Sequence, residues 1–145
     1  MILFLDANIP IWRFEGQPPY HLAARKTLDE LRERHADATL TVSRLSWLEC
    51  RIKPLRDEDQ VLLARYAGLF AGGVRVVELT AEVVDSAAEL RAKHGLKTPD
   101  ALQAASALRF PGPLIFLTGD AGFSRVKGLP VQVVKPLTPA QMRAR

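Results

Sequence analysis

Residues 2–6 read Ile2-Leu3-Phe4-Leu5-Asp6, an apolar run that ends in a carboxylate. Short apolar runs recur at residues 40–42, 74–77, 114–117 and 131–134, and segments long enough for helices separate most of them. The runs are almost continuously apolar, as expected for strands that helices cover on both faces. The alternation predicts a doubly wound α/β fold with a mainly parallel sheet of about five strands.

The segments between the runs carry apolar residues at helical spacing. Helices are predicted over residues 21–34, 45–52, with Pro54 as the stop signal, and 57–70, which Gly72-Gly73 ends; the second and third of these should form a projecting pair. Thr80 is the expected N-cap of a helix that ends near His94-Gly95. Another helix is expected to start at Thr98-Pro99-Asp100, with Thr98 as its N-cap.

The chain has 145 residues, of which 48% are hydrophobic and 25% charged, as in an ordinary globular protein. We therefore expect residues 1–145 to form one domain. No apolar stretch approaches the ~20 residues of a membrane span, and residues 1–5 are too short for a secretory signal, so a cytoplasmic protein is expected. Cys50, the only cysteine, lies in an apolar helical pattern and is predicted to be a buried thiol.

Four of the acids, Asp6, Glu49, Asp100 and Asp120, lie in or beside apolar segments where a strand ends or a helix passes. In an open parallel sheet, ligands bind beyond the carboxyl ends of the strands, and all four side chains could reach that edge. Four carboxylates in one pocket repel each other without a cation, so the pattern predicts a Mg²⁺ or Mn²⁺ site. Asn8 and Thr118 are expected to orient a carboxylate or a water there.

The charge distribution is compatible with a polyanionic substrate. The formal net charge is +4, and outside those four acids twelve acidic side chains face twenty lysines and arginines. An acidic metal pocket in a basic surface suits a phosphodiester substrate. The other reading is that these cations are solvated helix faces.

Four segments together resemble the motifs of PIN-domain ribonucleases, and the VapC toxins of toxin–antitoxin pairs in particular. They are Phe4-Leu5-Asp6-Ala7-Asn8, Ser46-Trp47-Leu48-Glu49, Thr98-Pro99-Asp100-Ala101-Leu102-Gln103-Ala104-Ala105 and Leu117-Thr118-Gly119-Asp120-Ala121-Gly122-Phe123. The resemblance implies a PIN-like three-layer α/β/α domain. It also implies a Mg²⁺- or Mn²⁺-dependent endoribonuclease, a homodimer that a cognate antitoxin inactivates.

The resemblance assigns Asp6, Glu49, Asp100 and Asp120 to catalysis and metal binding, with Asn8 and Thr118 in support. The chain departs from the pattern at Gly122, where many relatives carry a further acid, and at Gly119, where many have Asn or Asp. We therefore expect one metal ion.

The remaining polar and aromatic residues have no motif of their own. Lys97 is the best candidate to meet a substrate phosphate, because it is close to Asp100 in sequence. Trp12 and Trp47 are expected to pack or to contact a protein partner. The three histidines, His21, His35 and His94, lack metal-ligand spacing and are expected to be structural.

Two other functions remain open from the sequence. A phosphatase of the haloacid dehalogenase type also begins with an aspartate after its first strand, but Asn8 stands where that chemistry wants a second aspartate. A PIN-like RNA- or protein-binding module without catalysis is the other alternative. The four acids argue against it, since clustered negative charge repels the phosphates of a bound nucleic acid.

Overall fold

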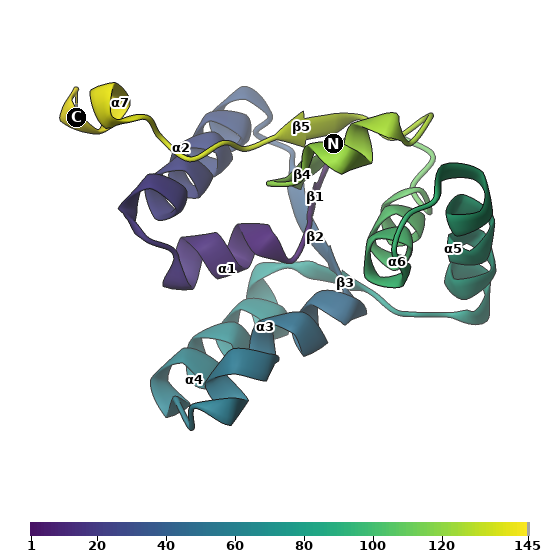
Figure 1. Ribbon diagram of the computed structural model, residues 1–145, viewed down its shortest axis with the longest axis horizontal. Coiled ribbons are helices and arrows are strands. Elements are labelled where there is room, and N and C mark those ends of the chain that lie inside the picture. Colours follow the sequence, from purple (N-terminus) through teal and green to yellow (C-terminus); the bar gives the residue numbers. More distant parts are fainter. Residues whose placement is uncertain (145) are drawn as a thin grey trace.

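The computed structural model describes residues 1–144 as a parallel five-stranded sheet with helices on both faces (Figure 1). The strands are β1 (Ile2–Leu5), β2 (Thr39–Ser43), β3 (Arg75–Val77), β4 (Leu114–Thr118) and β5 (Val131–Val133). Their order in the sheet is β3-β2-β1-β4-β5, and every neighbouring pair is parallel. The predicted α/β fold with about five mainly parallel strands is confirmed.

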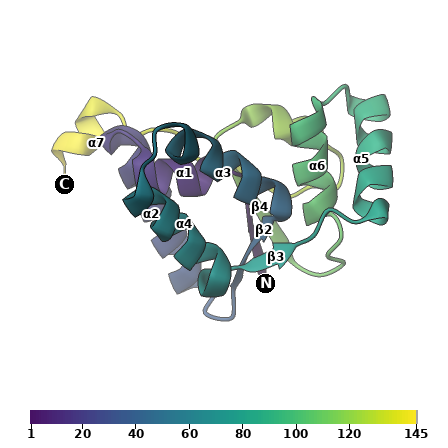
Figure 2. The ribbon, with the colours of Figure 1, turned by 90° about the horizontal axis from the view of Figure 1, so that it is seen from below.

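Successive side chains of β1 point to opposite faces of the sheet, and each face carries its own core. Phe4 packs with Phe116 against α5 (Ala81–His94) and α6 (Thr98–Ala107). Leu3 and Leu5 pack against α1 (Asn8–Glu15) and α2 (Pro18–Arg34). The three layers of the α/β/α arrangement follow from this division, and Figure 2 shows the α1–α2 and α5–α6 pairs on opposite sides.

Two further helices, α3 (Arg44–Arg56) and α4 (Gln60–Gly68), form a pair that projects from the sheet (Figure 1). A single π turn, η1 (Leu69–Gly73), leads from α4 into β3. A 3₁₀ turn, η2 (Ala121–Arg125), follows β4, and α7 (Pro139–Arg143) lies near the C-terminus. No helix within residues 1–144 is both long and apolar enough to span a membrane.

The helix pattern agrees with the sequence in outline and differs at four helix ends. Pro54 does not stop α3, which continues to Arg56; Pro54 lies in its last turn, where a missing N–H removes only one backbone bond. The segment predicted as one helix over residues 57–70 starts at Gln60 and changes to the π turn at Leu69. The helix predicted over residues 21–34 begins earlier, at Pro18.

The start of α6 also differs from the prediction. Lys97 is its N-cap and Thr98 its first helical residue, because the Thr98 hydroxyl accepts a hydrogen bond from Arg91 Nη1 (3.2 Å) and does not cap the helix. The prediction for α5 is confirmed at both ends: the Thr80 hydroxyl accepts from the Val83 N–H, and Gly95 ends the helix with a φ of 65°.

Candidate functional site

The candidate site lies beyond the carboxyl ends of β1 and β4, where the order of strands along the chain reverses. Asp6 directly follows β1, and Asp120 lies two residues after the end of β4. Glu49 comes from the middle of α3, which leaves the same end of β2, and Asp100 from the first turn of α6. All four acids therefore face this edge of the sheet from four separate elements.

Asp6 is the most buried of the four acids, with 7% of its surface exposed. Its Oδ1 accepts from the Ala7 N–H (2.9 Å), and its Oδ2 accepts from Thr118 Oγ1 (2.7 Å) and Asn8 Nδ2 (3.3 Å). Both residues predicted to support the site, Asn8 and Thr118, thus contact this carboxylate. Such bonds fix the orientation of a carboxylate before any ligand arrives.

The same two side chains also hold the loop that carries Asp120. Asn8 Oδ1 accepts from the Gly119 N–H (3.0 Å), and Thr118 Oγ1 accepts from the Asp120 N–H (3.0 Å). Asp120 Oδ1 in turn accepts from the Gly122 N–H at 2.8 Å. Asp6 and Asp120 are therefore linked by one hydrogen-bonded network across the ends of β1 and β4.

Glu49 is half-buried on α3 and receives a hydrogen bond from α6. Gln103 Nε2 donates to Glu49 Oε1 at 3.3 Å and to Ser46 Oγ at 2.9 Å. Sequence reasoning assigned no role to Gln103 or Ser46. Two sequence features could have pointed to them: a glutamine three residues after Asp100 in an otherwise alanine-rich buried helix, and a serine three residues before Glu49.

Three of the four acids have pKa values above their usual range. Burial, with the charges of Glu49 and Asp100, raises the pKa of Asp6 to about 6, although bonds from Thr118 and Ala7 oppose this. Burial and the charge of Asp100 raise the pKa of Glu49, which the Gln103 bond lowers. Burial and the charge of Asp120 raise the pKa of Asp100. The pKa of each of these three acids is therefore raised in part by the charge of another acid of the set.

The four carboxylates are within electrostatic reach of one another but are not closed around a single point. In residues 1–144, no group of three or more His, Cys, Asp or Glu side chains is close enough to hold a metal ion. The donor chemistry nevertheless fits a hard divalent cation, since all four groups are carboxylates whose mutual repulsion a cation would relieve.

Cationic side chains lie beside this acidic set. The positive charges of Lys97 and Arg125 act on Asp100 and oppose the rise of its pKa. Both side chains are exposed, Lys97 at the start of α6 and Arg125 at the end of η2. They can meet an anionic ligand approaching the acids.

Trp12 packs at the edge of the site. A Cβ on Gly119 would lie 2.6 Å from Cζ2 of the Trp12 ring, so the ring occupies the space that a side chain there would need. The ring also meets Tyr20 edge to face, with centroids 4.9 Å apart. Gly119 therefore accommodates Trp12, a pairing that the sequence analysis did not anticipate. Trp47 packs against Phe70 instead.

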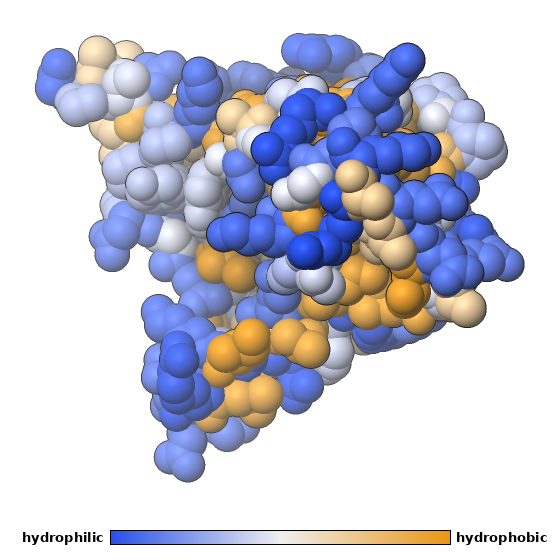
Figure 3. Space-filling model, turned by 45° about the vertical axis from the view of Figure 1, so that its right-hand side comes forward, coloured by the Kyte–Doolittle hydropathy of each residue, from blue (hydrophilic) through white to orange (hydrophobic). Residues whose placement is uncertain are grey.

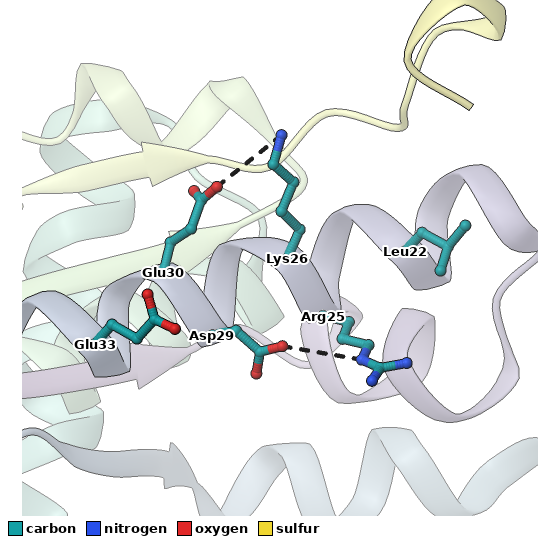
Figure 4. A pocket seen from close by; sticks show the side chains of 6 residues that line it. All are labelled: Leu22, Arg25, Lys26, Asp29, Glu30 and Glu33. Atoms are coloured by element: carbon teal, nitrogen blue, oxygen red, sulfur yellow. Dashed lines mark ion pairs between the residues drawn. The ribbon is translucent and has the colours of Figure 1, made fainter. Parts of the chain in front are cut away.

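A separate depression on α2 has no connection with the acids of the site. Figure 4 shows its walls, where Lys26 pairs with Glu30 and Arg25 with Asp29 along one helix. Such exposed pairs one turn apart contribute little energy and bring no convergent polar group. The depression is a solvated helix face.

Comparisons with known proteins agree with this fold. The family model of the PIN domain matches residues 3–129. Similar solved structures include VapBC2 from Rickettsia felis bound to a promoter DNA fragment, with 17% identity and a TM-score of 0.74 over 93% of this chain and 100% of that one.

A toxin–antitoxin complex from Klebsiella pneumoniae has 18% identity and a TM-score of 0.71 over 93% and 99% of the two chains. VapBC-1 from nontypeable Haemophilus influenzae has 20% identity and a TM-score of 0.69 over 92% and 98%. No curated protein sequence matches this chain. At these identities the likeness to the solved structures concerns the fold.

Proposed function

The chain belongs to the PIN-domain family, and on that premise we propose that it is a Mg²⁺- or Mn²⁺-dependent endoribonuclease that hydrolyses RNA phosphodiester bonds. One observation carries the proposal: the charges of Glu49, Asp100 and Asp120 each raise the pKa of another acid of the set, which indicates that the four carboxylates are close to one another. Clustered acids of this kind are unfavourable for binding RNA alone, whereas they suit a cation that contacts the phosphate.

The acids would hold one cation, and Asn8 and Thr118 would keep Asp6 in place for it. When bound, the cation supplies an activated water and stabilises the charge that develops on the phosphate oxygens. Lys97 and Arg125 would meet neighbouring phosphates of the strand, because their charges lie next to Asp100. The chain's own contribution is therefore to orient carboxylates and to attract the polyanion.

The test is RNA cleavage in Mg²⁺ by Asp6→Asn, with Asp29→Asn as the matched control. Asp29 is an exposed acid on α2, paired with Arg25 and remote from the site. We expect Asp6→Asn to lower the cleavage rate by more than about 100-fold. The loss of a group that only orients a metal ligand already lowers activity by about 10–100-fold, and Asp6 is proposed to be a ligand itself. Equal rates in Asp6→Asn and wild type would refute the proposal. If the wild type binds no Mn²⁺ in calorimetry, a binding module without catalysis replaces it.

We also propose that the protein is the toxin of a toxin–antitoxin pair and that a cognate antitoxin covers an apolar stripe on α3. Leu48, Ile52 and Leu55 lie one turn apart on this helix, and each is more than half exposed. Val61 of α4 is 75% exposed as well, and Figure 3 shows apolar residues gathered over this projecting pair. Contiguous exposed apolar surface is typical of a protein interface.

The stripe begins at Leu48, next to Glu49, so a partner bound there would also restrict access to the acids. The similar solved structures are VapBC and toxin–antitoxin complexes, which supports a protein partner of this kind. A homodimer is expected as well, and light scattering of the isolated chain tests it.

Co-expression tests the antitoxin. The wild type alone should arrest growth, and the small protein encoded beside it should restore growth and co-purify. Ile52→Glu should abolish co-purification, whereas Val84→Glu on α5, where Val84 is 49% exposed, should not. A partner that binds both variants equally would contradict the placement on α3.

A further inference from the structure

We infer that Gln103 is a positioning residue of the metal site, which holds the Glu49 carboxylate of α3 against the Asp100 helix. The inference rests on the proposed function, because it concerns the same cation. It adds a residue that has no acidic group and would act through Glu49 rather than as a metal ligand.

The geometry joins two acids that come from different helices. Gln103 lies three residues after Asp100, so both side chains are on one face of α6. Its Nε2 spans to α3 and donates to Glu49 Oε1 (3.3 Å) and Ser46 Oγ (2.9 Å). The amide is thus the direct hydrogen-bonded link between the helix of Asp100 and the carboxylate of Glu49.

Burial shows that the link is built into the core. Gln103 is 1% exposed and Ser46 is fully buried. Gln103 Oε1 has no hydrogen-bond partner within residues 1–144. With the amide reversed, an oxygen would face the oxygens of Glu49, so the donor nitrogen must point toward the carboxylate.

An unpartnered carbonyl in the core is unfavourable for folding. An apolar side chain of similar shape would remove the unpartnered oxygen. The polar residue is therefore explained by its two bonds to α3, of which the bond to Glu49 is the one that reaches the site. Groups that orient a metal-binding carboxylate without touching the metal typically account for 10–100-fold in affinity.

The experiment is Mn²⁺ binding by calorimetry to Gln103→Met, which keeps the length of the side chain and removes the amide. We expect about 10-fold weaker Mn²⁺ binding and a lower kcat with an unchanged KM for RNA. The melting temperature of the metal-free protein should change little, because the lost bond to Ser46 offsets the removal of the unpartnered carbonyl. A residue with a merely structural role would instead lower the melting temperature.

Ser106→Ala is the matched control. Ser106 is on the next turn of α6, equally buried, and bonds Ser43 Oγ (3.2 Å) and the Leu102 carbonyl rather than an acid. It should bind Mn²⁺ like wild type. In a Glu49→Ala background, Gln103→Met should have no further effect on Mn²⁺ affinity, because its target is gone.

A measurement on the wild type avoids any folding problem of the variant. The side-chain NH₂ resonances of Gln103 should shift when Mg²⁺ is added, and should not shift in Glu49→Ala. Unchanged Mn²⁺ affinity in Gln103→Met, or an unmoved Gln103 resonance in wild type, overturns the inference while Asp6→Asn still tests the nuclease. If the wild type binds no Mn²⁺, both proposals fail together.

Discussion

The strand-end half of the site, formed by Asp6, Asn8, Thr118 and Asp120, holds its carboxylates differently from the helix half, formed by Glu49 and Asp100. In the strand-end half, Asp6 is almost fully buried and accepts three hydrogen bonds. In the helix half, both acids are partly exposed, and Glu49 accepts one hydrogen bond, from Gln103 at 3.3 Å.

The difference is a difference in rigidity. Asp6 directly follows β1 and is oriented by Thr118 of the neighbouring strand β4 and by Ala7 and Asn8 at the start of α1. Glu49 and Asp100 depend on how α3 and α6 pack against each other. Substitutions in the strand-end half should therefore affect the proposed chemistry directly. Substitutions in the helix half should affect it through the packing of α3 against α6.

The largest expected effect concerns Asp6 itself and the metal-free protein. Its folded pKa of about 6 exceeds its ordinary value of 3.8, so the folded state binds the proton more tightly than the unfolded state. The resulting destabilisation is fully present above pH 6 and disappears as the pH falls toward 4. It amounts to about 3 kcal/mol for Asp6, and the raised pKa values of Glu49 and Asp100 act in the same direction.

Urea unfolding with a chelator at pH 5 and pH 7.5 measures this effect. We expect the wild type to be more stable at pH 5, and Asp6→Asn to lose most of the difference. A wild type that is more stable at pH 7.5 would contradict the burial of an unfavourable carboxylate at this point.

The next prediction compares the substitution of Thr118 with that of another buried threonine, Thr41. Thr118→Val removes a donor to Asp6 and an acceptor from the Asp120 N–H, and should weaken Mn²⁺ binding by roughly 10–100-fold. Because the Thr118 bond lowers the pKa of Asp6, its loss should also move the acid limb of the rate profile to higher pH. Thr41→Val is the control, since Thr41 is equally buried but bonds only the Thr39 carbonyl of its own strand.

A third change tests how Trp12 supports the strand-end half. Gly119→Ala would place a methyl group too close to the Trp12 ring, at 2.6 Å from Cζ2, and should lower the free energy of unfolding by about 2 kcal/mol. Gly112→Ala should have little effect, because nothing lies within 4 Å of its added carbon. If Trp12→Leu does not recover part of the loss in Gly119→Ala, the Trp12 ring is not the cause.

The same two halves show what the sequence could and could not predict. Asp6 and Asp120 follow short apolar runs, so their place at the sheet edge is readable from strand ends alone. The five strands were readable for the same reason: each is a local apolar run, and together they form the predicted parallel sheet.

The helix half depends on contacts between distant segments. Gln103 and Ser46 are 57 residues apart, and no local pattern states that their helices meet. Trp12 and Gly119, which are in contact, are even farther apart in sequence. Pro54 and Thr98 were misjudged for a different reason: each was read from a local preference, which the last turn of α3 and a bond from Arg91 override.

The smallest expected effect compares the starts of the two helices in the helix half. The Ser43 hydroxyl caps α3 by accepting from the Leu45 N–H (3.1 Å), whereas α6 begins without a side-chain cap, because the Thr98 hydroxyl bonds Arg91. Ser43→Ala should therefore cost about 1 kcal/mol of stability, and Thr98→Ala only a few tenths. Thermal unfolding of both variants decides this. A larger loss of stability in Thr98→Ala would mean that Thr98 caps α6 after all. The helices that carry Glu49 and Asp100 would then both start with a side-chain cap.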